Sequence, residues 1–187
     1  MSRHDIRTLM SSFNISEFSK IILDTNVLLF VHGGYSPTPQ ERAKYNSYSN
    51  FISLLISHNM VIFVSPLTLQ ELFHVIEAKE YKLYLESNSL NRQAFTLKQF
   101  RSNQILRANV KSKIQSVYQQ IKSAYEILDY TELKKYDVDN YVSTYDTHKF
   151  DPMDYILTKS FQYYVDTYYL TDDKDFLSDS TLEVISY

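Results

Sequence analysis

Short apolar runs separated by amphipathic segments divide the chain into alternating predicted strands and helices. The apolar runs 21–23 and 60–64 are continuous, which is typical of strands buried on both faces of a parallel sheet. A third short run, 168–170, predicts another strand, and the pair Val184-Ile185 predicts an edge strand. This alternation of strands and helices predicts an α/β fold with a mainly parallel sheet.

Helical spacing of apolar residues fills the segments between these strands. It predicts one helix over 40–59 and another that begins after Ser65, the expected N-cap before Pro66. The core-facing positions of this second helix are predicted to be Leu69, Leu72, Phe73, Ile76, Leu83 and Tyr84. A later helix is expected to start at Asp151-Pro152, and residues 1–19 are expected to be a polar lead-in with one helical turn near 15–18.

The segment 88–130 contains no glycine or proline. Apolar residues recur three and four positions apart from Ile114 to Leu128, which predicts two helices or one broken helix. We expect a helical hairpin that projects from the sheet. With 187 residues, the chain fits a single domain, 1–187, with a substantial core.

Composition excludes several kinds of site. The chain has no cysteine, which rules out disulfides, thiolate zinc sites and cysteine nucleophiles. Its two glycines, Gly33 and Gly34, are adjacent and open a predicted loop to Pro39, so the spaced glycines of phosphate-binding loops and nucleophile elbows are missing. The five histidines lack metal-ligand spacing, so any metal must be held by oxygen. No stretch approaches the roughly 20 apolar residues of a membrane span, so we expect a cytoplasmic protein.

Charge is segregated along the chain. Residues 87–125 carry seven basic and no acidic side chains, whereas residues 126–187 carry five basic and 14 acidic side chains. Such a basic segment is expected either to contact the phosphates of a nucleic acid or to pack against acidic residues.

Acidic residues recur where predicted strands end or helices begin. Asp24 follows the first strand, and Glu71 lies early in the helix after the second strand. The other members are Asp154 near a helix start and Asp172, Asp173 and Asp175 after the strand 168–170. Carboxylates gathered from distant segments repel one another unless they are protonated or bridged by cations, and oxygen ligands suit Mg²⁺ or Mn²⁺. Such ions can activate a water molecule and offset charge in phosphodiester hydrolysis.

Each acidic residue also has a purely structural interpretation. Asp24 can cap the following helix, Glu71 can be a solvated helix residue, and Asp151 can be only a cap. The aspartates of 172–175 can form a polar turn. Their joint placement at one edge of the sheet favours the metal site.

Four segments, in order, resemble the four acidic motifs of PIN-domain nucleases, a family that includes the VapC-like toxins of toxin–antitoxin modules. They are Ile-Leu-Asp-Thr-Asn-Val-Leu-Leu (22–29), Ser-Pro-Leu-Thr-Leu-Gln-Glu-Leu (65–72), Asp-Tyr-Ile-Leu (154–157) and Leu-Thr-Asp-Asp-Lys-Asp-Phe (170–176). The resemblance implies a three-layer α/β/α sandwich and a Mg²⁺- or Mn²⁺-dependent endoribonuclease.

The resemblance also implies roles for single residues. Metal-site positions are Asp24, Glu71, Asp154 and Asp173, with Asp175 and Asp151 as further candidate ligands. Supporting polar positions are Asn26, Thr171 and Asp172. The family's last motif reads threonine, any residue, aspartate, which favours Asp173 over Asp172 as a ligand.

Compact VapC-like toxins are shorter than this chain, and the extra length falls in the basic helical segment, which we interpret as an insertion at 88–130. Its candidate RNA contacts are Arg92, Lys98, Arg101, Arg107, Lys111 and Lys113. The alternative is packing against the acidic C-terminal third or against an acidic antitoxin. Expected partners are RNA, a small antitoxin and a second copy of the chain. The 17 tyrosines are expected mainly in cores and interfaces, and none is assigned to the substrate.

Two other functions remain open at this point. One is a catalytically silent PIN-like module that binds RNA or protein. The other is a phosphatase with Asp24 as the nucleophile, but that chemistry usually places a second acid two residues later, where this chain has Asn26.

Overall fold

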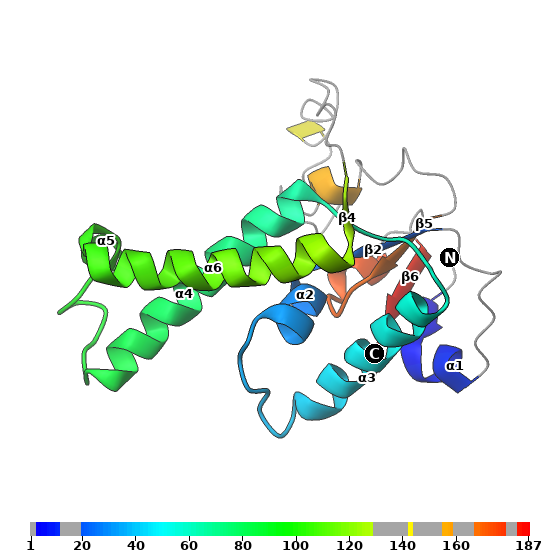
Figure 1. The fold of residues 1–187 in the computed structure, drawn as a ribbon, viewed down its shortest axis with the longest axis horizontal. Helices are drawn as coiled ribbons and strands as arrows, with labels where there is room; N and C mark the ends of the chain where they lie inside the picture. The colour runs from blue at the N-terminus through cyan, green and yellow to red at the C-terminus, as the bar shows by residue number, and fades with distance from the viewer. Residues whose placement is uncertain (1–2, 12–19, 129–141, 144–154, 159–166, 179–182) are drawn as a thin grey trace.

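A sheet of parallel strands forms the centre of the structure, a computed structural model (Figure 1). The structure describes residues 3–11, 20–128, 142–143, 155–158, 167–178 and 183–187. Within them, six strands pair in the order β1-β6-β5-β2-β3-β4, and every pairing is parallel. The strands are β1 (Arg3–Asp5), β2 (Lys20–Leu23), β3 (Ile62–Val64), β4 (Glu126–Ile127), β5 (Thr167–Leu170) and β6 (Glu183–Ser186). The predicted parallel α/β architecture is confirmed.

Helices connect and flank these strands. They are α1 (Ile6–Ser11), α2 (Thr25–His32), α3 (Arg42–Ser57), α4 (Pro66–Ser87), α5 (Leu97–Ser102), α6 (Gln104–Ala124) and the 3₁₀ helix η2 (Asp175–Ser178). Residues 155–158 form a further helical turn. Among the described residues, no helix is long and apolar enough to cross a membrane.

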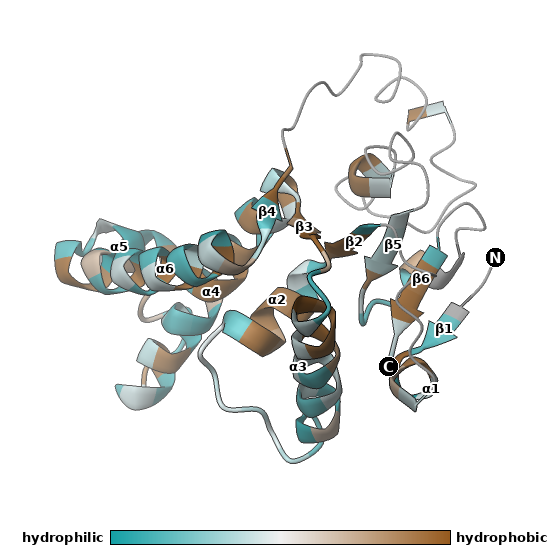
Figure 2. Cartoon of the chain, turned by 45° about the vertical axis from the view of Figure 1, so that its right-hand side comes forward, coloured by the Kyte–Doolittle hydropathy of each residue, from teal (hydrophilic) through white to brown (hydrophobic). Residues whose placement is uncertain are grey.

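Alternate residues of the central strands serve two separate cores. Ile21 and Leu23 face a large core that includes buried residues of α2, α3, α4 and α6. Ile22 faces the opposite core, together with Leu157 and with Phe176 of η2. In Figure 2 the central strands β2 and β3 are coloured mainly as hydrophobic, as expected for strands covered on both faces. The predicted three-layer arrangement therefore follows from side chains alternating between two apolar layers.

Several predicted elements match the structure closely. The helix expected over 40–59 is α3, and its apolar residues Tyr48, Phe51, Ile52 and Leu55 are all buried. Ser65 is the N-cap of α4, where its hydroxyl accepts a hydrogen bond from the Leu67 amide at 3.2 Å. Residues 33–41 form the loop expected after the two glycines.

Two strands, β1 and β4, were not predicted, and a third, β6, was predicted at the wrong place in the sheet. The lead-in contains β1 and α1, whereas the turn expected near 15–18 lies outside the described residues. The helix expected to continue to residue 130 ends at Ala124, and β4 follows it. The predicted edge strand is β6, which lies inside the sheet because β1 pairs with its outer side. Strands of two or three residues leave too short a pattern to be distinguished from the end of a helix.

The helical hairpin exists, but its first helix lies outside the predicted segment. It consists of α4 and α6, with α5 at its tip, and extends away from the sheet (Figure 1). We call this unit the helical arm. Its tip has a small core of Tyr81, Leu85, Phe100 and Val110. Leu83, predicted to face the core, is 45 % exposed because the core-facing stripe of α4 passes through Tyr81 and Leu85 instead.

Candidate active site

Asp24 lies where β2 ends and α2 begins. Its backbone amide donates to the Leu170 carbonyl at 3.0 Å, and its carbonyl accepts from the Leu28 amide at 3.0 Å. Its carboxylate also accepts from the Thr25 amide at 2.7 Å, so the residue is the N-cap of α2. The capping interpretation is thus correct, and it fixes the carboxylate at the carboxyl edge of the sheet, where open α/β folds place their active sites.

The Asp24 carboxylate is buried and held by two further donors. Only 4 % of the residue is exposed. The Tyr169 hydroxyl donates to Oδ1 at 2.9 Å, and the Thr171 hydroxyl donates to Oδ2 at 2.6 Å. Donors therefore reach both oxygens, so the side chain is held in one orientation.

Burial raises the pKa of Asp24 from 3.8 to about 6. The hydrogen bonds from Thr171, Tyr169 and Thr25 act in the opposite direction, and the nearby charge of Glu71 raises the pKa further. The pKa of Asp24 stays raised although three donors contact its carboxylate, because burial disfavours the negative charge. A nearby cation would offset that charge.

Glu71 is joined to Asp24 through Thr25. The Thr25 hydroxyl donates to Glu71 Oε2 at 2.6 Å, and the hydroxyl also lies 3.4 Å from the Thr68 carbonyl. Thr25 is buried, whereas Glu71 is exposed, so Glu71 lies on the side of the site that faces solvent. The first residues of α2 and the second turn of α4 therefore bring two predicted ligands together.

Asp173 is joined to Asp24 through Thr171. The same Thr171 hydroxyl that donates to Asp24 accepts from the Asp173 amide at 2.9 Å. Asp173 in turn accepts from the Asp175 amide at 2.9 Å, and Asp175 itself is exposed at the start of η2. The structure thus links Asp173 to the site by its backbone and places Asp175 at the surface.

Asp172 interacts with α3 instead of the acidic site. Both of its oxygens accept from the Lys44 ammonium, at 2.9 and 2.8 Å, and Oδ1 also accepts from the Tyr48 hydroxyl at 3.2 Å. Its neighbour Asp173 makes no such ion pair among the described residues. Asp172 is thus held by α3, and the choice of Asp173 as the ligand stays a prediction.

Three other predicted positions complete the comparison. Asn26 is exposed in the first turn of α2 and lines a cavity beside the loop that follows. Asp154 and Asp151 lie outside the described residues. Their roles remain predictions.

The carboxylate oxygens of the described acids are suitable ligands for a divalent cation, but the described acids do not form a complete metal site. Among the described residues, no three histidine or acidic side chains gather closely enough to hold a metal by themselves. The pair Asp24 and Glu71 supplies oxygen ligands, and neither is ion-paired with a described Lys, Arg or His. Mg²⁺ commonly binds through one or two carboxylates and keeps several water ligands, so this pair fits a magnesium-type ion.

Two residues of the site escaped the sequence prediction. Tyr169 was not assigned to the site, although its hydroxyl contacts Asp24. Thr25 stands in the first of the four acidic segments but was given no role there. Tyr169 lies near Asp24 because the parallel register of β2 and β5 pairs it with Ile22, two residues before Asp24. That register cannot be read from one strand alone.

The basic segment is partly neutralised within the arm. Arg101 pairs with Glu77, with Nε 2.9 Å from Oε1, and Lys113 pairs with Glu80 at 2.7 Å. Two of the six candidates therefore pair with acids of α4, and not with the acidic C-terminal third that the sequence analysis named. Candidates without an ion pair among the described residues are Arg92, Lys98, Arg107 and Lys111, all exposed.

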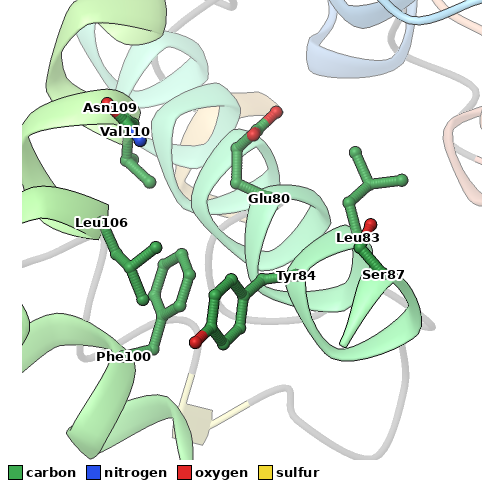
Figure 3. A pocket seen from close by; sticks show the side chains of 8 residues that line it. All are labelled: Glu80, Leu83, Tyr84, Ser87, Phe100, Leu106, Asn109 and Val110. Atoms are coloured by element: carbon green, nitrogen blue, oxygen red, sulfur yellow. The ribbon is translucent and has the colours of Figure 1, made fainter. Parts of the chain in front are cut away.

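A cavity of 240 Å³ lies within the arm, between α4, α5 and α6 (Figure 3). Its walls include Phe100, Leu106 and Val110. Glu80 is its acidic residue, and that side chain already accepts from Lys113 and from Tyr35. This cavity lacks the paired carboxylates of the Asp24 site and does not offer the same chemistry.

The six-stranded parallel sheet, with helices on both faces and acids at its carboxyl edge, is a PIN-like fold. Among solved structures, the chain is similar to VapBC2 from Rickettsia felis bound to a DNA fragment from their promoter. The TM-score is 0.56 at 15 % identity, with 90 % of this chain and 98 % of that chain covered. No protein-family model and no curated protein sequence matches the chain.

Proposed function

We propose that this protein is a Mg²⁺- or Mn²⁺-dependent endoribonuclease that hydrolyses RNA phosphodiester bonds with water as the nucleophile. One observation carries the proposal. The buried Asp24 carboxylate is connected through Thr25 to Glu71 and through Thr171 to Asp173 at the carboxyl edge of a PIN-like sheet.

The residues have separate tasks in this proposal. Asp24 and Glu71 hold the cation, with Asp173 and Asp154 as the additional acids. The bound cation supplies the lowered water pKa and offsets phosphate charge. Thr171 and Tyr169 keep Asp24 in one rotamer, because their hydroxyls donate to its two different oxygens. Thr25 fixes Glu71 at 2.6 Å and so sets the spacing of the two carboxylates.

A toxin-like role restrained by a small antitoxin is part of the proposal. The support is the similarity of the fold to VapBC2 across nearly the whole length of both chains. The exposed cations of the helical arm supply the positive surface that an acidic protein needs near a polyanionic substrate.

Incubation of the purified protein with a mixed RNA pool tests the activity. We expect cleavage with added Mn²⁺ or Mg²⁺ and none with a chelator, because the acids need a cation to activate water. The Asp24→Asn variant serves as the inactive control. Cleavage that persists in the chelator contradicts the metal mechanism, and RNA binding without cleavage under any condition supports the silent module.

Charge reversal on the arm tests its contact with RNA. We expect Lys98→Glu combined with Lys111→Glu to weaken binding and to lower the salt slope by about 1.4, since each lost single-strand phosphate contact removes about 0.7. Salt titrations of a labelled RNA measure this slope. The matched control is Lys82→Glu, at an arm position that already pairs with Glu86. An unchanged salt slope in the double variant would show that Lys98 and Lys111 do not contact RNA phosphates and that the segment has a structural role.

A further inference from the structure

A second, smaller cavity lies beside the acidic site and is not part of it. Its volume is 140 Å³. The first two turns of α2 contribute Asn26 and Phe30, and the following loop contributes Tyr35. The start of α3 and the middle of α4 complete the walls with Tyr45 and Lys79.

Two sets of contacts link the wall of this cavity to the acidic site. Asn26 lies two residues after Asp24 on the same helix start. Phe30 stacks on Tyr48, with ring centroids 5.9 Å apart, and the Tyr48 hydroxyl donates to the Thr171 carbonyl at 3.1 Å. On α4, Lys79 lies eight residues beyond Glu71, about 12 Å by helical rise. Asn26 is therefore the wall residue that adjoins the start of α2, where Asp24 is the N-cap.

Contacts with α4 and α6 hold the Tyr35 wall in place. The Tyr35 hydroxyl donates to Glu80 at 3.0 Å, and the Lys113 ammonium lies 3.7 Å from the Tyr35 ring centroid. Lys79 approaches the same ring, 4.7 Å from its centroid. An aromatic wall held by α4 and α6 is preorganised for a flat ligand.

The chemistry of the lining matches a nucleobase. Tyr45 offers aromatic surface, whereas the Tyr35 ring already contacts Lys79 and Lys113. Base–aromatic stacking is the common means of holding single-stranded RNA. Lys79 supplies donors, Glu41 supplies acceptors, and the Asn26 amide supplies both. A cavity of about 150 Å³ holds one benzene-sized ring, so the size favours a pyrimidine over a purine.

We propose that this cavity binds one unpaired pyrimidine base of the RNA next to the cleaved phosphodiester. The inference rests on the proposed ribonuclease function, which supplies the RNA. It gives the enzyme a preference for sites with a pyrimidine beside the scissile bond, read by Asn26, Glu41 and Lys79.

Nucleotide binding in the presence of a chelator tests the proposal without any cleavage. Cytidine, uridine, adenosine and guanosine monophosphates are titrated into the ¹⁵N-labelled protein and followed by NMR. We expect both pyrimidine nucleotides to bind several-fold more tightly than both purine nucleotides, and to shift the side-chain amide signal of Asn26. Equal affinity for purines and pyrimidines, or shifts confined to other residues, overturns the proposal.

Variants assign the binding to this cavity. Tyr45→Ala is expected to weaken cytidine monophosphate binding about tenfold through lost stacking, whereas Tyr45→Phe keeps the ring and the affinity. Lys79→Met is expected to weaken binding, while Lys82→Met, one turn further along α4, leaves it unchanged. Wild-type affinity in both Tyr45→Ala and Lys79→Met overturns the proposal. Absence of RNA cleavage with Mn²⁺ contradicts the nuclease function alone, because the nucleotide titration does not depend on it.

Discussion

Replacing Asp24 with asparagine is expected to abolish RNA cleavage and, at neutral pH, to raise the free energy of unfolding. The folded protein holds the pKa of Asp24 at about 6, above the ordinary value of 3.8. The folded state therefore binds this proton more tightly than the unfolded state does. As the pH rises from 3.8 through 6, ionisation of Asp24 lowers the free energy of unfolding, by up to about 3 kcal/mol above pH 6.

Asparagine removes this cost and keeps most of the local geometry. Its oxygen can still accept from the Thr25 amide and the Tyr169 hydroxyl. We therefore expect the variant to be more stable than the wild type at pH 7.5 and to lose this advantage near pH 4. Urea unfolding at both pH values, in a chelator, measures the difference.

Added Mg²⁺ provides the control for this experiment. It is expected to stabilise the wild-type protein and to leave Asp24→Asn nearly unchanged, because the cation offsets the charge that burial penalises. A variant that matches the wild type at pH 7.5 as well as at pH 4 contradicts the raised pKa. Equal stabilisation of both proteins by Mg²⁺ contradicts Asp24 as a ligand.

Replacing Thr171 with valine is expected to destabilise the protein by about 1.5–3 kcal/mol, the range for a hydrogen bond to a charged group. Thr171 is fully buried, donates to Asp24 at 2.6 Å and accepts from the Asp173 amide at 2.9 Å. Valine has nearly the same shape but makes neither bond. RNA cleavage is expected to fall as well, because Asp24 loses the donor to Oδ2.

A double-mutant cycle separates this hydrogen bond from packing. In the Asp24→Asn background, the cost of Thr171→Val is expected to shrink by about 1 kcal/mol or more, since the charge-assisted bond is already gone. Thr171→Ser keeps the hydroxyl and should retain the coupling. Strictly additive losses in urea unfolding would show that Thr171 acts through packing alone.

Local patterns were sufficient to predict the elements around the site. The aliphatic run before Asp24, the amphipathic spacing of α3 and the Ser65-Pro66 pair each depend on neighbouring residues, and all three match the structure. Because parallel strands end at one edge, Asp24 and Glu71 could also be predicted to meet. Thr25 then explains how the two carboxylates are held near each other, because its amide donates to Asp24 and its hydroxyl donates to Glu71.

Contacts between distant segments could not be predicted in the same way. Tyr169 reaches Asp24 only through the pairing of β2 with β5, and Asp172 is held by Lys44 of α3. The basic segment looked free of acids because its partners, Glu77 and Glu80, precede it on α4. Strand β4 has only two residues and depends on its pairing with β3, so its own sequence carries little signal.

The two hydroxyl donors to Asp24 are separated from it by 145 and 147 positions along the chain. Synthesis proceeds from the N-terminus, so Asp24 and Glu71 leave the ribosome long before Tyr169 and Thr171 do. The central pairing of β2 with β5 must also wait for this last part of the chain. The hydrogen-bonded centre around Asp24 can therefore form only after Tyr169 and Thr171 have been synthesised, long after α2 and α4.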